Sequence, residues 1–287
     1  MSALRVENGD SHQLLVVDFH SHLVDSASAG ALIASLEEAG VAARVISAPL
    51  EFLKDLEGVN DSIAELVGRH PGRVHGMASV DAYTGEAAAE ELVRGVRSLG
   101  LRGVFMESAK GALLPDAPEA RPTLTAAAEL GVPVFLHPVP DPQLAGRFGR
   151  LGRLGARLTR STVNSAALVA LLSSGVLEAL PGLNVVVTAL AFGGLVLAAS
   201  SPERARLRQV YIDTTGMDRV AMRGSIAILG ADHVLTGTDW PVVQEKDVPG
   251  SLEAMFDDVG LDAGARRAIA GENALRLLGA KMVTVTI

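Results

Sequence analysis

The chain alternates short apolar segments with helix-forming segments over nearly its whole length. Strands this apolar are typical of a parallel sheet that is buried on both faces. Eight repeats of strand and helix predict a closed (β/α)8 barrel of the TIM type, with a doubly wound open sheet as the alternative. The predicted strands are Leu14–Phe19, Arg44–Ser47, Val74–Val80, Leu101–Met106, Val134–Leu136, Asn184–Ala189, Val210–Asp213 and Val234–Thr238. The clearest helices are Ala29–Ala39, Asp61–Arg69, Glu86–Leu99, Pro122–Leu130 and Ala166–Leu172.

The length of 287 residues suits a single barrel, and no linker or low-complexity segment divides the chain. We therefore expect one domain over residues 1–287. The longest apolar run, Val185–Ala199, is interrupted by Gly193 and Gly194, which predicts a buried strand that leads into a helix rather than a membrane span. The tail Lys281–Ile287 alternates apolar residues with threonine, which predicts an edge strand against the body of the protein.

Charge and cysteine content exclude several classes of function. The net charge is −8, and the arginines between Arg147 and Arg160 are separated by glycine and leucine, so nucleic acid is excluded as a partner. The absence of cysteine excludes disulfides, thiolate metal sites and a cysteine nucleophile, and it favours a cytoplasmic location. Met1–Gln13 lacks the apolar core of a signal peptide. We expect a soluble protein without membrane contact that acts on a small molecule.

Three histidines and one aspartate stand at the ends of predicted strands. His20 and His22 lie on one face of the first strand with Asp18 below them, His137 ends the fifth strand, and Asp239 ends the eighth. In a barrel, the C-terminal ends of all strands face one mouth, so these side chains converge. Three imidazoles and a carboxylate suit one divalent metal, with zinc expected. The alternative is three unrelated core histidines.

Other polar residues follow predicted strands near the same mouth. Glu107, after the fourth strand, is a candidate metal ligand or proton shuttle, although an exposed loop glutamate near Lys110 is the simpler interpretation. Lys110 is a candidate for binding a substrate carboxylate, although a solvated loop lysine is the simpler interpretation. Tyr83, just past the third strand, is a candidate substrate contact. The remaining histidines are expected to be structural or solvated: His12, His70, His75 and His233.

Six motifs are spread over nearly the whole chain: Asp18-Phe19-His20-Ser21-His22, Asn60 with Arg69–Gly76, Leu99–Val104, Gly131–Pro138, Gly237–Pro241 and Glu272–Leu278. Together they resemble the amidohydrolase-related family, in the branch of aminocarboxymuconate-semialdehyde decarboxylase and the resorcylate-type decarboxylases. The resemblance implies the barrel fold, a single divalent metal (usually zinc), and metal ligands His20, His22, His137 and Asp239. It also suggests a homodimer.

One position departs from the family pattern. The resemblance implies a histidine that acts as acid or base at the end of the sixth strand, two residues before a Gly-Gly pair, and this chain has Ala191 there. Alanine cannot transfer a proton or polarise a carbonyl. Three explanations compete: a natural variant that uses another acid or base, a protein that has lost the usual activity, or an engineered substitution.

Three functions are compatible with these residues. The first is a hydrolase in which the metal lowers the pKa of a bound water, with Asp239 as ligand, proton acceptor or both. The second is a decarboxylase of a small aromatic or unsaturated carboxylic acid, which suffers more from the missing histidine because it needs a proton donor. The third is a binding protein or impaired homologue that keeps the metal pocket without turnover.

Overall fold

The computed structural model describes residues 14–24, 26–50 and 55–280. Its strands are β1 (Val17–His22), β2 (Ala43–Ser47), β3 (Val74–Gly76), β4 (Ala78–Ser79), β5 (Val104–Glu107), β6 (Val134–His137), β7 (Val185–Val187), β8 (Val210–Asp213) and β9 (Val234–Leu235). Its α-helices are α1 (Ser26–Glu38), α2 (Leu56–Arg69), α3 (Glu86–Arg97), α4 (Arg121–Leu130), α5 (Pro142–Phe148), α6 (Gly152–Ser173), α7 (Val176–Ala179), α8 (Phe192–Ala199), α9 (Arg219–Leu229), α10 (Val248–Val259), α11 (Ala263–Arg267) and α12 (Asn273–Leu277).

The strands are parallel and follow one another around a ring in sequence order. They form two ladders, β1 to β3 and β4 to β9, because the third predicted strand is interrupted at Met77. The Met77 amide donates to the Ile46 carbonyl at 2.9 Å, and the Ala78 amide donates to the Gly103 carbonyl at 2.9 Å. The chain therefore passes from one ladder to the next without leaving the ring.

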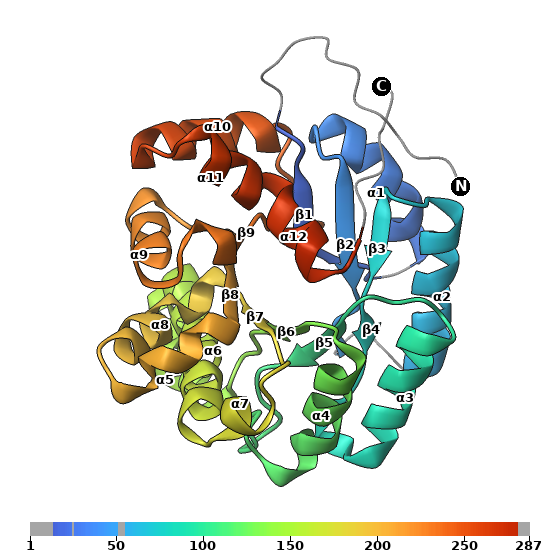
Figure 1. Cartoon of the computed structure of the whole chain (residues 1–287), viewed down its shortest axis with the longest axis vertical. Helices are drawn as coiled ribbons and strands as arrows, with labels where there is room; N and C mark the ends of the chain where they lie inside the picture. The colour runs from blue at the N-terminus through green and yellow to red at the C-terminus, as the bar shows by residue number, and fades with distance from the viewer. Residues whose placement is uncertain (1–13, 25, 51–54, 281–287) are drawn as a thin grey trace.

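Backbone hydrogen bonds join the first strand to the segment after β9. The Phe19 amide donates to the Thr236 carbonyl at 2.8 Å, and the His22 amide donates to the Trp240 carbonyl at 2.7 Å. The Asp239 amide donates back to the His20 carbonyl at 2.8 Å. These bonds complete the (β/α)8 barrel, and the helices surround it in Figure 1.

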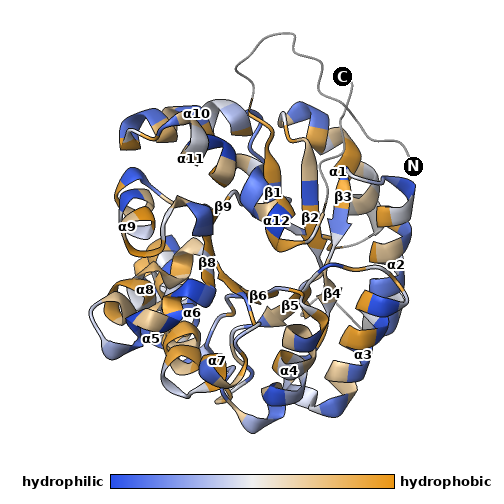
Figure 2. Ribbon diagram, in the orientation of Figure 1, coloured by the Kyte–Doolittle hydropathy of each residue, from blue (hydrophilic) through white to orange (hydrophobic). Residues whose placement is uncertain are grey.

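Hydrophobic residues fill both the barrel interior and the layer between strands and helices. Figure 2 shows strands coloured largely as hydrophobic and helices that carry both hydrophobic and hydrophilic residues. Inside the barrel, Phe19, Phe105 and Phe135 pack edge to face, with Phe135 5.8 Å from Phe19 and 6.2 Å from Phe105 between ring centroids. The ring of His20 lies 4.8 Å from that of Phe135, so this aromatic cluster lies directly beside the site described below.

The largest difference from the predicted elements lies in the segment after β6. The Gly/Arg-rich segment there was expected to be a loop before a helix at Ala166–Leu172, and that expectation is wrong, since α5 and α6 occupy it. Gly155 permits the arrangement: a Cβ there would lie 2.0 Å from the Phe148 carbonyl oxygen, so glycine is required for close packing rather than for a loop. The predicted tail strand Lys281–Ile287 and the segment Met1–Gln13 lie outside the described residues.

The run Val185–Ala199 forms β7, a short turn and α8, as predicted. Among the helices that the structure describes, none combines the length and the hydropathy needed to cross a bilayer.

His75 on β3 makes folding stability sensitive to acid. Burial and the nearby charge of Arg102 lower the pKa of His75 from 6.5 to about 4, and its Nε2 has no hydrogen-bond partner among the described residues. As the pH falls, the His75 imidazole is protonated in the unfolded chain at a higher pH than in the folded protein. The free energy of unfolding therefore decreases by roughly 3 kcal/mol between pH 6.5 and a pH below about 4. Urea unfolding measures the free energy of unfolding at about pH 7 and about pH 4. The decrease between the two pH values should be smaller in His75→Gln than in the unmodified protein. An equal loss in both would contradict this prediction.

Candidate metal centre

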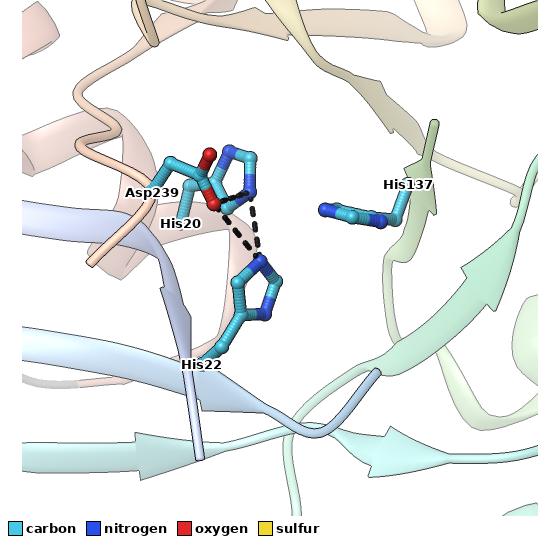
Figure 3. Close-up of side chains that lie close together, drawn as sticks. All are labelled: His20, His22, His137 and Asp239. Atoms are coloured by element: carbon cyan, nitrogen blue, oxygen red, sulfur yellow. Dashed lines mark hydrogen bonds and ion pairs between the residues drawn. The ribbon is translucent and has the colours of Figure 1, made fainter. Parts of the chain in front are cut away.

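Four side chains from three separate parts of the sequence meet at the mouth of the barrel (Figure 3). His20 and His22 come from β1, His137 from the end of β6, and Asp239 from the segment after β9. One donor atom from each residue lies within 4.8 Å of the donor atoms of the others. This is the convergence that the strand-end positions predict.

A bulge in β1 places both histidines inside the barrel. Pairing with β2 shifts between Asp18 and Ser21, so the alternation of faces is broken there. His20 contacts the interior Phe135, whereas Asp18 hydrogen-bonds to Ser21 and to Arg44 on β2. The prediction that Asp18 lies below the two histidines is therefore wrong, because the bulge turns His20 to the face opposite that of Asp18.

The second nitrogen of each β1 histidine is held by a polar partner. The Nδ1 of His20 donates to Asp213, at the end of β8, over 2.6 Å, and the Thr215 hydroxyl lies 2.9 Å from the same nitrogen. The Nδ1 of His22 lies 3.2 Å from the Ser47 hydroxyl. These contacts turn the Nε2 of both rings towards the cluster.

Burial and neighbouring charges set the protonation of the cluster. Burial lowers the pKa of His22 and of His137, and the charge of His20 lowers both further. Burial alone would lower the pKa of His20, but the Asp213 carboxylate, with Asp239 and Asp18, raises it above its ordinary value. For Asp239, burial is outweighed by the hydrogen bond to His22 and by nearby positive charge, so its pKa is lowered. Metal binding requires neutral imidazoles and an ionised carboxylate, so a bound cation would displace the proton that the raised pKa of His20 favours.

The donor atoms fit a divalent cation. The Nε2 atoms of His20 and His22 are 3.1 Å apart, and the Asp239 Oδ1 lies 3.4 Å from the first and 3.3 Å from the second. Because the Nδ1 of His20 donates to Asp213, its Nε2 presents a lone pair to this cluster once the ring is neutral. Hydrogen bonds connect these donor atoms, and a divalent cation that displaces the shared protons would be held by two imidazole nitrogens and a carboxylate oxygen, so the residues present fit the expected metal.

Backbone geometry after β9 brings Asp239 to the cluster. Asp239 has φ of 66°, a conformation that aspartate adopts more readily than most residues. Gly237 lies against the other side of the site, where a Cβ would be 2.9 Å from the Cβ of His20 and 3.0 Å from that of Asp213. Only glycine lets β1, β8 and this segment approach so closely.

A cavity of about 490 Å³ opens directly onto the four residues. Its polar lining includes the cluster and Glu107, which is half-buried at the end of β5 and pairs in register with His137. Much of the remaining wall is apolar: Val24, Pro49, Pro138, Val139, Pro140, Leu190, Val242 and Val243. Glu107 is thus part of the cavity wall rather than an exposed loop residue.

Lys110 and Tyr83 do not line this cavity. Lys110 forms an ion pair with Asp81. The buried Tyr83 hydroxyl donates to the Glu107 carbonyl at 3.1 Å, and burial together with the charge of Glu107 raises the pKa of Tyr83. The structure therefore places Tyr83 as a support for the end of β5 and Lys110 as an exposed loop lysine, and it places neither residue on the cavity wall.

The segment after β7 presents Leu190 to the cavity instead of Ala191. Ala191 is fully buried in the hydrophobic core at the start of α8, whereas Leu190 and Thr188 line the cavity. The Ser161 hydroxyl donates to the Leu190 carbonyl at 2.6 Å and fixes this turn. The Ala191 side chain therefore does not reach the cavity, because a 3-10 turn at Ala189–Ala191 directs it into the core.

Sequence reasoning missed three residues of the site. Asp213 could have been found as an acidic residue at the end of a predicted strand, by the rule that identified His137 and Asp239. Arg157 and Arg160 also line the cavity, but they come from α6 in a segment expected to be a loop. Their spacing of three residues was the available signal.

Asp213→Asn should weaken metal binding. Asp213 accepts from the Ala189 and Thr215 amides, at 3.0 and 3.1 Å, as well as from His20, so it fixes the orientation of that ring. Loss of the charge removes this support, and we expect metal affinity to fall roughly 10–100-fold in a competition titration with a chelator. Asp218→Asn, at the exposed start of α9, is the matched control and should leave affinity unchanged. Equal affinities in both variants would rule out the role of Asp213.

Comparison with known proteins gives the family. The chain is similar to 2-amino-3-carboxymuconate-6-semialdehyde decarboxylase of Dictyostelium discoideum (25% identity, over 80% of this chain and 68% of that protein). It is also similar to gamma-resorcylate decarboxylase of Rhizobium radiobacter (28% identity, over 80% and 78%). Its fold matches a dihydroxybenzoic acid decarboxylase of Polaromonas sp. JS666, solved with manganese and the inhibitor 2-nitroresorcinol, with a TM-score of 0.80 at 20% identity over 93% and 97% of the two chains. The family model described as amidohydrolase matches residues 17–280. The chain therefore belongs to the amidohydrolase family.

Proposed function

We propose that this protein is a metal-dependent decarboxylase of a small aromatic or unsaturated carboxylic acid. The observation that carries the proposal is the position of the four metal-binding side chains at one end of a largely apolar cavity. The Dictyostelium and Rhizobium relatives, both named as decarboxylases, support this reaction over hydrolysis, which the sequence analysis placed first.

His20, His22, His137 and Asp239 would hold one divalent cation. When bound, the cation supplies Lewis acidity and a positive charge that orients a carboxylate and stabilises developing negative charge. The histidine-rich donor set supports zinc, whereas the Polaromonas protein was solved with manganese. Elemental analysis of the purified protein decides between them.

The apolar walls exclude water and hold the hydrocarbon part of the substrate. Decarboxylation breaks the bond between the carboxylate carbon and the substrate carbon, releases CO2, and leaves an electron pair that takes up a proton. Glu107 is a carboxylate on the cavity wall outside the cluster, so we assign to it the relay of that proton from solvent.

Glu107→Gln should lower turnover at least about tenfold and leave metal content unchanged.

The test is an activity panel with metal-loaded protein on hydroxybenzoates, unsaturated dicarboxylates, amides and lactones. CO2 release from an acid, lost on chelation, supports the proposal. Hydrolysis of amides or lactones without CO2 release would replace it with the hydrolase alternative. Tight binding of an acid without any turnover would favour the impaired homologue, and Leu190→His, which places an imidazole on the cavity wall, would then test whether the missing acid or base explains the loss.

A further inference from the structure

Two arginines of α6 face the cavity that contains the metal-binding cluster. Arg157 and Arg160 are three residues apart, so they lie next to each other on one face of the helix. Arg160 is half-buried, and Arg157 is exposed at the rim, where its Nη2 lies 3.4 Å from the Gly216 carbonyl oxygen. Two positive charges thus line the same space as the cluster.

Neither guanidinium forms an ion pair with a carboxylate among the residues that the structure describes. Other arginines with restricted exposure do: Arg94 pairs with Asp61 and Glu91, and Arg266 pairs with Glu253 and Asp257. Arg160 thus keeps a half-buried charge without direct contact to a carboxylate, with Asp239 as a more distant counter-charge, on a chain whose net charge is −8. Arg157 and Arg160 therefore form a positively charged patch on the cavity wall of an acidic protein.

The charge of Arg160 reaches the cluster electrostatically. It contributes to the lowered pKa of both His137 and Asp239. Apolar side chains, Val139, Leu190 and Val242 among them, line the same cavity, and its volume of about 490 Å³ lies in the range of small-molecule sites. The cavity thus offers a cation-binding cluster, an apolar wall and a pair of guanidinium groups.

We propose that Arg157 and Arg160 bind a second anionic group of the substrate, so that the substrate is a dicarboxylic acid on a flat unsaturated or aromatic framework. One carboxylate faces the cluster, and the second accepts charge-assisted hydrogen bonds from the arginines. The assignment of the first carboxylate rests on the proposed function, whereas the binding of the second does not require turnover.

The experiment measures binding of unreactive probes by calorimetry. Metal-loaded full-length protein is titrated with benzoate and with the benzene-1,2-, 1,3- and 1,4-dicarboxylates, for the unmodified protein and for Arg157→Gln, Arg160→Gln and Arg160→Lys. Arg153→Gln is the matched control, because Arg153 is an exposed arginine of the same helix that does not line the cavity. Thermal melts establish that each variant is folded.

The unmodified protein should bind its preferred dicarboxylate at least about tenfold more tightly than benzoate. Arg160→Gln should remove most of the preference for the dicarboxylate over benzoate, and Arg157→Gln should remove part of it. Arg160→Lys should reduce the preference less than Arg160→Gln does. Arg153→Gln should retain the full preference. Absence of a dicarboxylate preference in the unmodified protein, or its retention in both glutamine variants, overturns the inference. An arginine-dependent preference in a protein that releases no CO2 would refute the proposed function and leave the subsite in place.

Discussion

His137→Ala is expected to abolish CO2 release and to remove most of the bound metal. His137 is the proposed ligand from the far side of the barrel, and its ring lies 5.3 Å from that of His20 and 4.8 Å from that of His22, measured between centroids. Burial holds its pKa well below the ordinary value, so it is a neutral donor at neutral pH. Without it, two histidines and one carboxylate remain to hold the cation.

The expected loss of activity is about a thousandfold or more, because a Lewis-acid cation stabilises developing charge by several kcal/mol. Elemental analysis should show metal well below one equivalent in this variant, while the circular dichroism spectrum stays that of the barrel. His70→Ala, at the end of α2, is the control and should keep both metal and activity. Full metal occupancy with unchanged CO2 release in His137→Ala would remove the basis of the proposed function.

The barrel and the clustering of three histidines with Asp239 could be predicted because both follow from strand ends. Each parallel strand brings its last residues to one mouth, so His22, His137 and Asp239 converge whatever the details of their loops. The apolar strand segments and the glycines between elements identified the strand-helix repeats of the barrel without any knowledge of which residues contact one another. Asp213 obeys the same rule and was reachable from the sequence.

Features that depend on local backbone geometry could not be predicted. The bulge after Asp18 reverses the faces of β1, and the turn after β7 exchanges Ala191 for Leu190 on the cavity wall. Both are shifts of one residue, and one residue changes which side chain faces the substrate. Arg157 and Arg160 were hidden because glycine-rich sequence resembles a loop, whereas Gly155 serves close packing with α5.

Beside the metal centre lies a buried ion pair whose disruption should strongly destabilise the fold. Arg44 is 1% exposed, pairs with Asp18, and lies over the Trp240 ring at 5.2 Å. Asp18 also accepts hydrogen bonds from the Thr238 hydroxyl at 2.7 Å and from the Ser21 hydroxyl at 2.7 Å. One carboxylate thus connects β1, β2 and the segment that carries Asp239.

Asp18→Asn is expected to lower the free energy of unfolding by about 3–5 kcal/mol, because it leaves the Arg44 guanidinium buried without a counter-charge. Urea denaturation at neutral pH measures the loss. Asp61→Asn is the matched control: it breaks an exposed ion pair with Arg94, which contributes about 1 kcal/mol or less. The double variant Asp18→Asn with Arg44→Met should recover part of the stability, since it removes the uncompensated charge. If Asp18→Asn costs no more than Asp61→Asn, the ion pair does not hold these three segments together, and the position of Asp239 must depend on backbone hydrogen bonds alone.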